Sequence, residues 1–177
     1  MFLNKIKLFL VISTCLIFLS LTNIDVESQE IKLISGVAKV IDGDTIKIEN
    51  KKIRLFGIDA PETKQFCKEV YLSFLIFNFK RDYKCGEKST SALKKKIKNK
   101  KIRCLIQDKK DRYRRNIGIC YLEKQDINSW LVKNGYAIAY RRYSKKYIID
   151  EQYAEDNKLG IWQGTFMEPE KWRRIMN

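Results

Sequence analysis

Three short segments rich in β-branched residues follow one another between positions 37 and 58 of this chain. They are Val37–Ile41, Thr45–Glu49 and Ile53–Ile58, and each alternates in part between apolar and polar residues. The turn residues Asp42-Gly43 separate the first two, and Asn50-Lys51-Lys52 separates the second from the third. Short strands joined by such turns predict an antiparallel β-meander.

Two more strands and three helices are expected further along the chain. Periodicity and end signals place strands at Lys101–Gln107 and Ile117–Leu122, and helices at Ser89–Lys98, Ile127–Asn134 and Tyr147–Lys158. The helices thus follow the third and the fifth strand. This order predicts an α+β, mainly β domain: a five-stranded OB-type Greek-key barrel with about three helices.

Residues 1–28 have the pattern of a targeting segment. Lys5 and Lys7 precede an apolar run from Leu8 to Leu21, which suits a signal-peptide core and is short for a membrane span. No clean small-x-small cleavage site follows, so an uncleaved N-terminal anchor stays open. We expect one domain, 29–177, in an exported protein, secreted or periplasmic, which contacts a membrane only if that segment is uncleaved.

Four cysteines lie within the expected domain: Cys67, Cys85, Cys104 and Cys120. An even count in an exported chain favours two disulfides, for which three pairings exist. Cys104 and Cys120 flank Asp111-Arg112-Tyr113 almost symmetrically, as cross-strand partners in a hairpin do. We therefore predict Cys104–Cys120 and Cys67–Cys85. Zinc is the alternative, but the chain has neither a Cys-x-x-Cys pair nor a histidine.

The chain is strongly basic, with 36 Lys and Arg against 21 Asp and Glu and a formal net charge of +15. This charge predicts a polyanionic partner, with solubility alone as the alternative. Because there is no histidine, Ser-His and Cys-His catalysis are excluded. Acid–base work is left to Asp, Glu, Tyr, Lys or metal-bound water.

Acidic residues nonetheless gather near the predicted meander. Asp44 at a strand start and Asp59 at a strand end can converge across neighbouring strands, with the Ala60 carbonyl as a third oxygen. Asp42 is a further ligand or an outer-shell group. Ca²⁺ prefers oxygen ligands and tolerates irregular geometry. The pattern predicts a hard metal ion bound beside an anionic substrate.

In combination these motifs resemble the staphylococcal nuclease (thermonuclease) family. The matching stretches, in the family's order, are Asp42-Gly43-Asp44-Thr45, Arg54, Asp59-Ala60-Pro61-Glu62-Thr63, Asp111-Arg112-Tyr113-Arg114-Arg115 and Gly160-Ile161-Trp162. Each piece alone is a weak signal, whereas the set is specific. The resemblance implies an OB-type barrel that hydrolyses DNA and RNA phosphodiesters with Ca²⁺ and leaves 3′-phosphate ends.

The resemblance also implies a role for each matching residue. Asp44, Asp59 and the Ala60 carbonyl correspond to the calcium ligands. Arg54 and Arg115 correspond to the arginines that grip the scissile phosphate, and Glu62 to the group proposed to activate water. The implied substrate contacts are Tyr113, Arg114, and Tyr140 or Tyr143. Taken singly, these residues also have ordinary structural interpretations, such as a surface arginine or a glutamate that caps a turn.

One departure concerns Arg114, which stands where the family usually has glycine. If that position requires a positive φ, an arginine there costs on the order of 1 kcal/mol. Arg114 also adds a positive charge beside the expected site.

Two other functions compete with catalysis. One is a nuclease-like barrel that binds nucleic acid without cutting it, although such domains lose the carboxylates or arginines that this chain keeps. The other is a cationic protein that binds anionic lipids or glycans, which leaves the acidic cluster unexplained. We expect a monomer without an obligate protein partner.

The segment Val70–Phe79, with the sequence VYLSFLIFNF, is almost wholly apolar and too short to span a membrane. We expect it to be an insertion that packs on the barrel. The alternative is an exposed patch for a membrane or a partner.

Overall fold

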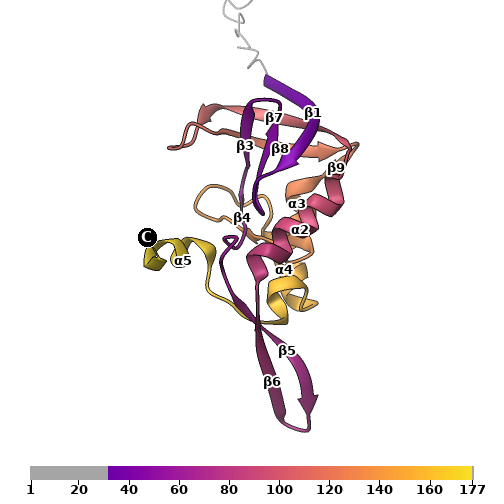
Figure 1. The fold of residues 1–177 in the computed structure, drawn as a ribbon, viewed down its shortest axis with the longest axis vertical. Coiled ribbons are helices and arrows are strands. Elements are labelled where there is room, and N and C mark those ends of the chain that lie inside the picture. The colour runs from indigo at the N-terminus through magenta and orange to yellow at the C-terminus, as the bar shows by residue number, and fades with distance from the viewer. Residues whose placement is uncertain (1–31, 177) are drawn as a thin grey trace, which may run out of the picture. The chain divides into compact units, whose positions relative to one another are not determined.

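A computed structural model describes residues 32–176 of the chain, and the predicted targeting segment 1–28 lies outside the described residues. Five strands form a closed barrel: β1 (Lys32–Val40), β2 (Thr45–Ile48), β3 (Lys51–Leu55), β7 (Lys101–Lys110) and β8 (Asn116–Leu122). Their order is β3-β2-β1-β7-β8, and a parallel pairing of β3 with β8 closes the circle. The predicted OB-type barrel is confirmed (Figure 1).

Alternation along the meander fills the barrel. Ile46 and Ile48 on β2 and Ile53 and Leu55 on β3 are almost fully buried, while the residues between them are more exposed. Because successive strand residues point to opposite faces, one set of aliphatic side chains, most of them β-branched, fills the barrel. The core therefore follows directly from the pattern that predicts the strands.

Four helices complete the described part of the domain. They are α2 (Cys85–Ile97), α3 (Ile127–Lys133), α4 (Ile148–Asp156) and α5 (Pro169–Met176), with a 3₁₀ turn, η1 (Gly160–Gln163). In α2, Leu93 and Ile97 lie one turn apart and are both buried. Asp126 caps α3 by accepting a hydrogen bond from the Ser129 amide at 3.0 Å. The three predicted helices are confirmed, and α2 begins four residues earlier than expected.

Two features near the site differ from the expected elements. The strand expected at Ile53–Ile58 breaks at Gly57, whose φ is +73°, and the chain resumes as β4 (Ile58–Asp59), paired with β10 (Ile138–Ala139). The C-terminal helix α5 is not among the predicted elements. Pro169 occupies its first position, where a missing N–H and a fixed φ favour helix initiation.

The expectation that Val70–Phe79 packs on the barrel is wrong. The segment forms most of a hairpin of β5 (Cys67–Phe74) and β6 (Phe77–Tyr83) that projects from the rest of the domain (Figure 1). Every residue from 71 to 80 is exposed. The paired residues Leu72–Phe79 and Phe74–Phe77 form one apolar face of this hairpin, and that face stays exposed because the hairpin extends away from the barrel. Two short strands pair with neighbours in these sheets: β9 (Gln125–Asp126) is antiparallel to β8, and β11 (Gly164–Thr165) is antiparallel to β5.

Both predicted disulfides are present. Cys104 and Cys120 are direct partners on β7 and β8, and Cys67–Cys85 joins the start of β5 to the start of α2. Two disulfides indicate an oxidising environment. Within the part of the chain that the structure describes, no helix is long and apolar enough to cross a membrane.

Removing the barrel disulfide is expected to destabilise the fold. With a sequence separation of 16 between its cysteines, loop closure predicts that Cys104→Ala/Cys120→Ala loses about 2–4 kcal/mol of unfolding free energy. Urea denaturation without reductant measures this loss. The matched pair Cys67→Ala/Cys85→Ala, with a separation of 18, should lose a similar amount. An unchanged midpoint in either double variant would contradict the entropic account of that disulfide.

Candidate active site

Arg54 joins the two aspartates of the acidic motifs. Its Nη1 lies 2.6 Å from Asp44 Oδ1 and its Nη2 lies 2.7 Å from Asp59 Oδ1. Asp44 immediately precedes β2, Arg54 lies opposite Thr45 on β3, and Asp59 ends β4. The structure thus brings the two carboxylates together, and both are buried.

Local hydrogen bonds fix Asp44 in place. Its Oδ1 accepts from the Thr45 hydroxyl at 3.0 Å and its Oδ2 from the Ala60 amide at 3.1 Å. The Asp44 amide in turn donates to Asp42 Oδ1 at 3.1 Å. Burial, together with the nearby charge of Asp44, raises the pKa of Asp42 to about 6. Negative charge is therefore crowded here, which favours a bound cation.

The loop that carries Glu62 is held from both sides. The Gln65 amide donates to the Glu62 carbonyl at 2.7 Å, and the Gln65 side chain donates to the Met167 carbonyl at 2.6 Å. On the helix side, Gly86 packs so closely that a Cβ there would overlap the Glu62 carbonyl. The Cys67–Cys85 disulfide ties down the end of the same loop. The backbone of the loop that carries Glu62 is therefore held firmly in place.

Arg115 reaches the cluster from the turn between β7 and β8. Its Nε lies 2.7 Å from Asp111 Oδ2, and its Nη1 donates to the Thr45 hydroxyl at 3.1 Å. Thr45 thus connects Arg115 to Asp44. Burial opposes ionisation of Asp111, but hydrogen bonds from the Arg115 amide and guanidinium lower the pKa of Asp111 below its usual value.

Tyr113 and Arg114 lie at the rim of the site on the same turn. The Tyr113 ring is 64% exposed, and the guanidinium carbons of Arg112 and Arg115 lie 4.9 Å and 5.4 Å from its centre. Arg114 has a φ of +60°, so the position does require the left-handed conformation that favours glycine. The turn therefore presents the exposed Tyr113 ring next to the positive charges of Arg112 and Arg115.

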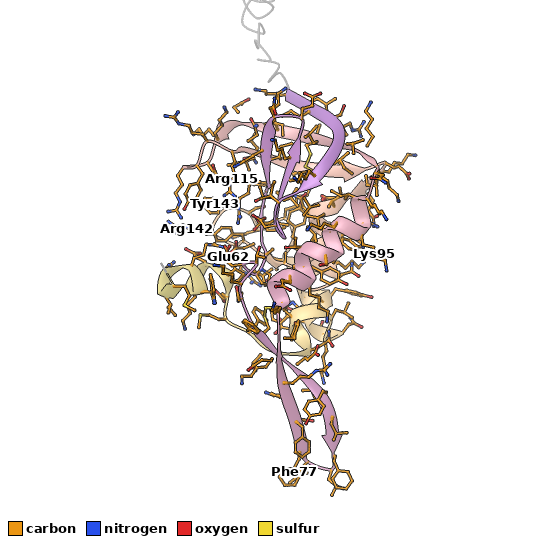
Figure 2. All side chains as sticks on the ribbon, in the orientation of Figure 1. Glu62, Phe77, Lys95, Arg115, Arg142 and Tyr143 are labelled. Carbon is orange, nitrogen blue, oxygen red and sulfur yellow. A yellow bond between two sulfur atoms is a disulfide. The ribbon has the colours of Figure 1, made fainter. Side chains whose placement is uncertain are left out.

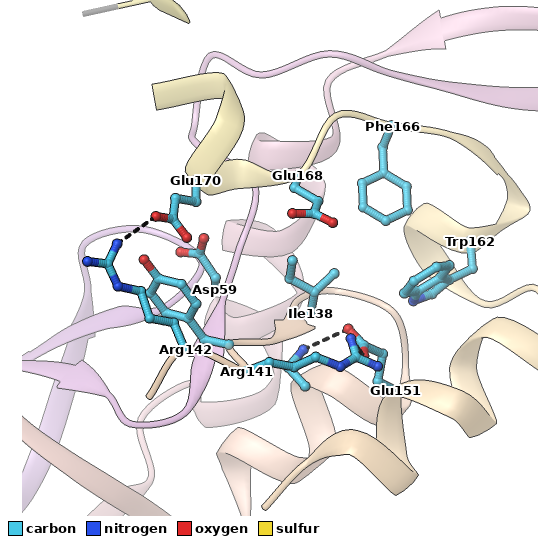
Figure 3. Close-up of a pocket in the computed structure, with 11 residues that line it drawn as sticks. Asp59, Ile138, Arg141, Arg142, Glu151, Trp162, Phe166, Glu168 and Glu170 are labelled. Atoms are coloured by element: carbon cyan, nitrogen blue, oxygen red, sulfur yellow. Dashed lines mark hydrogen bonds and ion pairs between the residues drawn. The ribbon is translucent and has the colours of Figure 1, made fainter. Parts of the chain in front are cut away.

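Tyr140 and Tyr143 follow β10 and pack edge to face, with ring centres 4.7 Å apart. Tyr140 is one of the residues that line a pocket with Asp59, which Figure 3 labels, whereas Tyr143 is 61% exposed. Burial raises the pKa of Tyr140, and the charges of Asp59 and Glu170 raise it further. Arg142 closes one side of the pocket through an ion pair with Glu170 at 3.0 Å.

Arg173, on α5, is the site residue that sequence reasoning missed. Its Nη2 lies 2.9 Å from Asp59 Oδ2, and its Nη1 lies 3.0 Å from Asp59 Oδ1 and 2.8 Å from Glu62 Oε1. This guanidinium connects Glu62 to the buried pair. Pro169, followed by the apolar and basic residues of Trp172–Met176, is the signal that predicts a helix here.

The donor set fits a hard cation. The donors are oxygens throughout, and in residues 32–176 every cysteine is in a disulfide. Within that range, no group of three or more acidic or cysteine side chains is arranged to hold a metal ion by itself. Two carboxylates completed by backbone, water and substrate phosphate are an ordinary set for an oxygen-ligated divalent ion. One of these two carboxylates, Asp59, already forms an ion pair with the Arg173 guanidinium.

Comparison with known proteins shows what this fold and site resemble. The family model described as staphylococcal nuclease homologue matches residues 52–164. The succinoglycan biosynthesis protein ExoI of Rhizobium meliloti is 36% identical, over 73% of this chain and 65% of its own length. An uncharacterised endonuclease of Haemophilus influenzae is 35% identical, over 78% of this chain and 71% of its own length. Micrococcal nuclease of Shigella flexneri is 29% identical, over 78% of this chain and 79% of its own length. The chain belongs to the staphylococcal nuclease family.

Replacing Arg114 by glycine is expected to stabilise the protein. The left-handed conformation strains an arginine but not a glycine, so Arg114→Gly should gain up to about 1 kcal/mol. Urea denaturation measures the change. Arg112→Gly, in the same turn, is the matched control, because Arg112 does not have a positive φ and should gain nothing. Equal loss of stability in both variants would contradict this explanation.

Proposed function

We propose that this chain is a calcium-dependent endonuclease that hydrolyses DNA and RNA phosphodiesters and leaves 3′-phosphate ends. The observation that carries the proposal is the pair of arginines, Arg54 and Arg115, held by acids around Asp44 and Asp59. Membership of the family, and relatives named as nucleases, support a hydrolase that acts on nucleic acids.

Asp44, Asp59 and the Ala60 carbonyl would hold the calcium ion, with Asp42 behind them. When bound, the ion polarises the phosphate and orients a water. The aspartates stay in position because Arg54 and the Ala60 amide hold their oxygens. Arg173 contacts both oxygens of Asp59, so this ion pair would have to open for the calcium ion to bind there.

Arg54 and Arg115 would stabilise the charge that develops on the phosphate oxygens. A planar guanidinium donates two parallel hydrogen bonds, which a lysine does not. The side chains of both arginines are about one-fifth exposed or less, at 16% and 19%, so each keeps some surface that a phosphate can approach. Asp44 and Asp59 hold Nη1 and Nη2 of Arg54, and Asp111 holds Nε of Arg115.

Glu62 would accept the proton of the attacking water. Its side chain is 34% exposed and its backbone is fixed, so it can face both solvent and the phosphate. Tyr113, Arg114, Tyr140 and Tyr143 would hold the flanking nucleotides by stacking and charge. The net charge of +15 would attract the polyanion over a longer range. The two disulfides are consistent with action outside the cytoplasm.

The proposal predicts a chelator-sensitive nuclease with two essential arginines. Arg54→Lys and Arg115→Lys should each lower kcat by on the order of 10²-fold, because each loses a paired transition-state donor while the charge remains. Digestion of single- and double-stranded DNA and RNA in Ca²⁺, with the product ends identified, measures this. Arg103→Lys, an exposed change on β7, is the matched control. Full activity in excess chelator, or 5′-phosphate ends, would contradict the proposal.

The contact of Arg173 with Asp59 and Glu62 gives a second prediction. A guanidinium and a calcium ion compete for the same carboxylate, so Arg173→Gln should bind Ca²⁺ more tightly than the unmodified protein. The control Arg174→Gln removes a charge from the same helix, but that residue pairs only with Glu170 among the ion pairs of residues 32–176. Calorimetric titration with Ca²⁺ distinguishes the variants. Weaker binding by Arg173→Gln alone would show that Arg173 supports the ligands instead.

A further inference from the structure

The end of the β5–β6 hairpin exposes an apolar surface. Leu75 and Ile76 in the turn are 86% and 87% exposed, and Phe74 and Phe77 beside them are 64% and 60% exposed. From Val70 to Phe79 the sequence contains no charged residue. An exposed cluster of this size marks an interaction site.

Apolar side chains gather on one face of the hairpin and at its turn. Cross-strand partners share a face, so the pairs Leu72–Phe79 and Phe74–Phe77 lie on one face, whereas the polar pair Ser73–Asn78 lies on the other. Lys80, two residues beyond Asn78 on the same strand, also belongs to the polar face. An apolar, aromatic face opposite a polar and basic one is the distribution of groups that suits a lipid interface.

Polarity increases from the tip toward the domain. Behind the tip, Ser73 and Asn78 are joined by a side-chain hydrogen bond of 2.7 Å. Tyr71 lies next, with the Arg81 guanidinium carbon 5.9 Å from its ring centre. Aromatic rings followed by cations are the sequence of groups found at a membrane interface.

The charges and the length of the hairpin fit the surface of an anionic bilayer. Residues 67–84 carry four basic side chains, at 68, 80, 81 and 84, against two acidic ones, at 69 and 82. Lys80 is three residues from Phe77, or about 10 Å along a strand, which matches the depth of interfacial insertion. Cations at this distance meet the headgroups when the tip enters the acyl boundary.

We propose that the β5–β6 hairpin is a membrane-docking element that inserts its tip into an anionic lipid surface. Figure 2 shows Phe77 at the far end of the hairpin, well away from Glu62 and Arg115. Insertion of the tip therefore leaves the nuclease site open to substrate. The proposal concerns this hairpin, independently of whether the N-terminal segment is cleaved.

Vesicle binding by the purified full chain tests the proposal, with the N-terminus of each preparation identified by mass spectrometry. Co-sedimentation with vesicles of phosphatidylglycerol and phosphatidylcholine should show binding, and Leu75→Ser/Ile76→Ser should weaken it by about ten-fold or more. The matched control, Val37→Ser/Ile149→Ser, removes two exposed apolar side chains elsewhere and should bind like the unmodified protein. All forms should cut a short oligonucleotide equally without vesicles.

A local probe separates the hairpin from the N-terminal segment. Leu75→Trp should give additional tryptophan emission that shifts to the blue and is quenched by brominated lipids in anionic vesicles. Unchanged emission, or equal vesicle binding by Leu75→Ser/Ile76→Ser, would overturn the proposal. It would also be overturned if that double variant only converted an oligomer into a monomer, because the tip would then be a protein contact.

Discussion

The ion pairs that Arg54 makes with Asp44 and Asp59 are the contacts on which the rest of the site depends. They connect the end of β4 to the start of β2 through a side chain on β3, at distances of 2.6 Å and 2.7 Å. Removing one partner of a buried ion pair leaves an uncompensated charge, which costs about 3–5 kcal/mol. The same contacts that keep the barrel end together therefore hold the proposed ligands and the proposed phosphate donor in register.

The proposed site explains why acidic residues gather at one place in a strongly basic chain. The chain carries +15, yet Asp42, Asp44, Asp59 and Glu62 lie close to one another, and two guanidiniums offset them within residues 32–176. Burial, and then the charge of Asp44, raise the pKa of Asp42 in this cluster. A basic surface with an acidic centre suits a polyanionic substrate that approaches a bound cation.

Local patterns in the sequence were sufficient to predict the barrel, three helices and both disulfides. Alternation at Ile46, Ile48 and Ile53 sets the strands, and the spacing of Cys104 and Cys120 matches a hairpin. Long-range placement was not predictable in this way. Arg173 follows Asp59 by more than a hundred residues, and only the docking of α5 brings them together. The prediction for Val70–Phe79 was wrong because apolar composition indicates burial, whereas the apolar face of this hairpin is exposed.

A crystal structure with Ca²⁺ and a non-cleavable oligonucleotide tests the central claim most directly. The account predicts one calcium ion bound by Asp44, Asp59 and the Ala60 carbonyl, with the scissile phosphate between that ion and the guanidiniums of Arg54 and Arg115. A calcium ion bound elsewhere, or a phosphate that contacts neither arginine at saturating Ca²⁺, would contradict it.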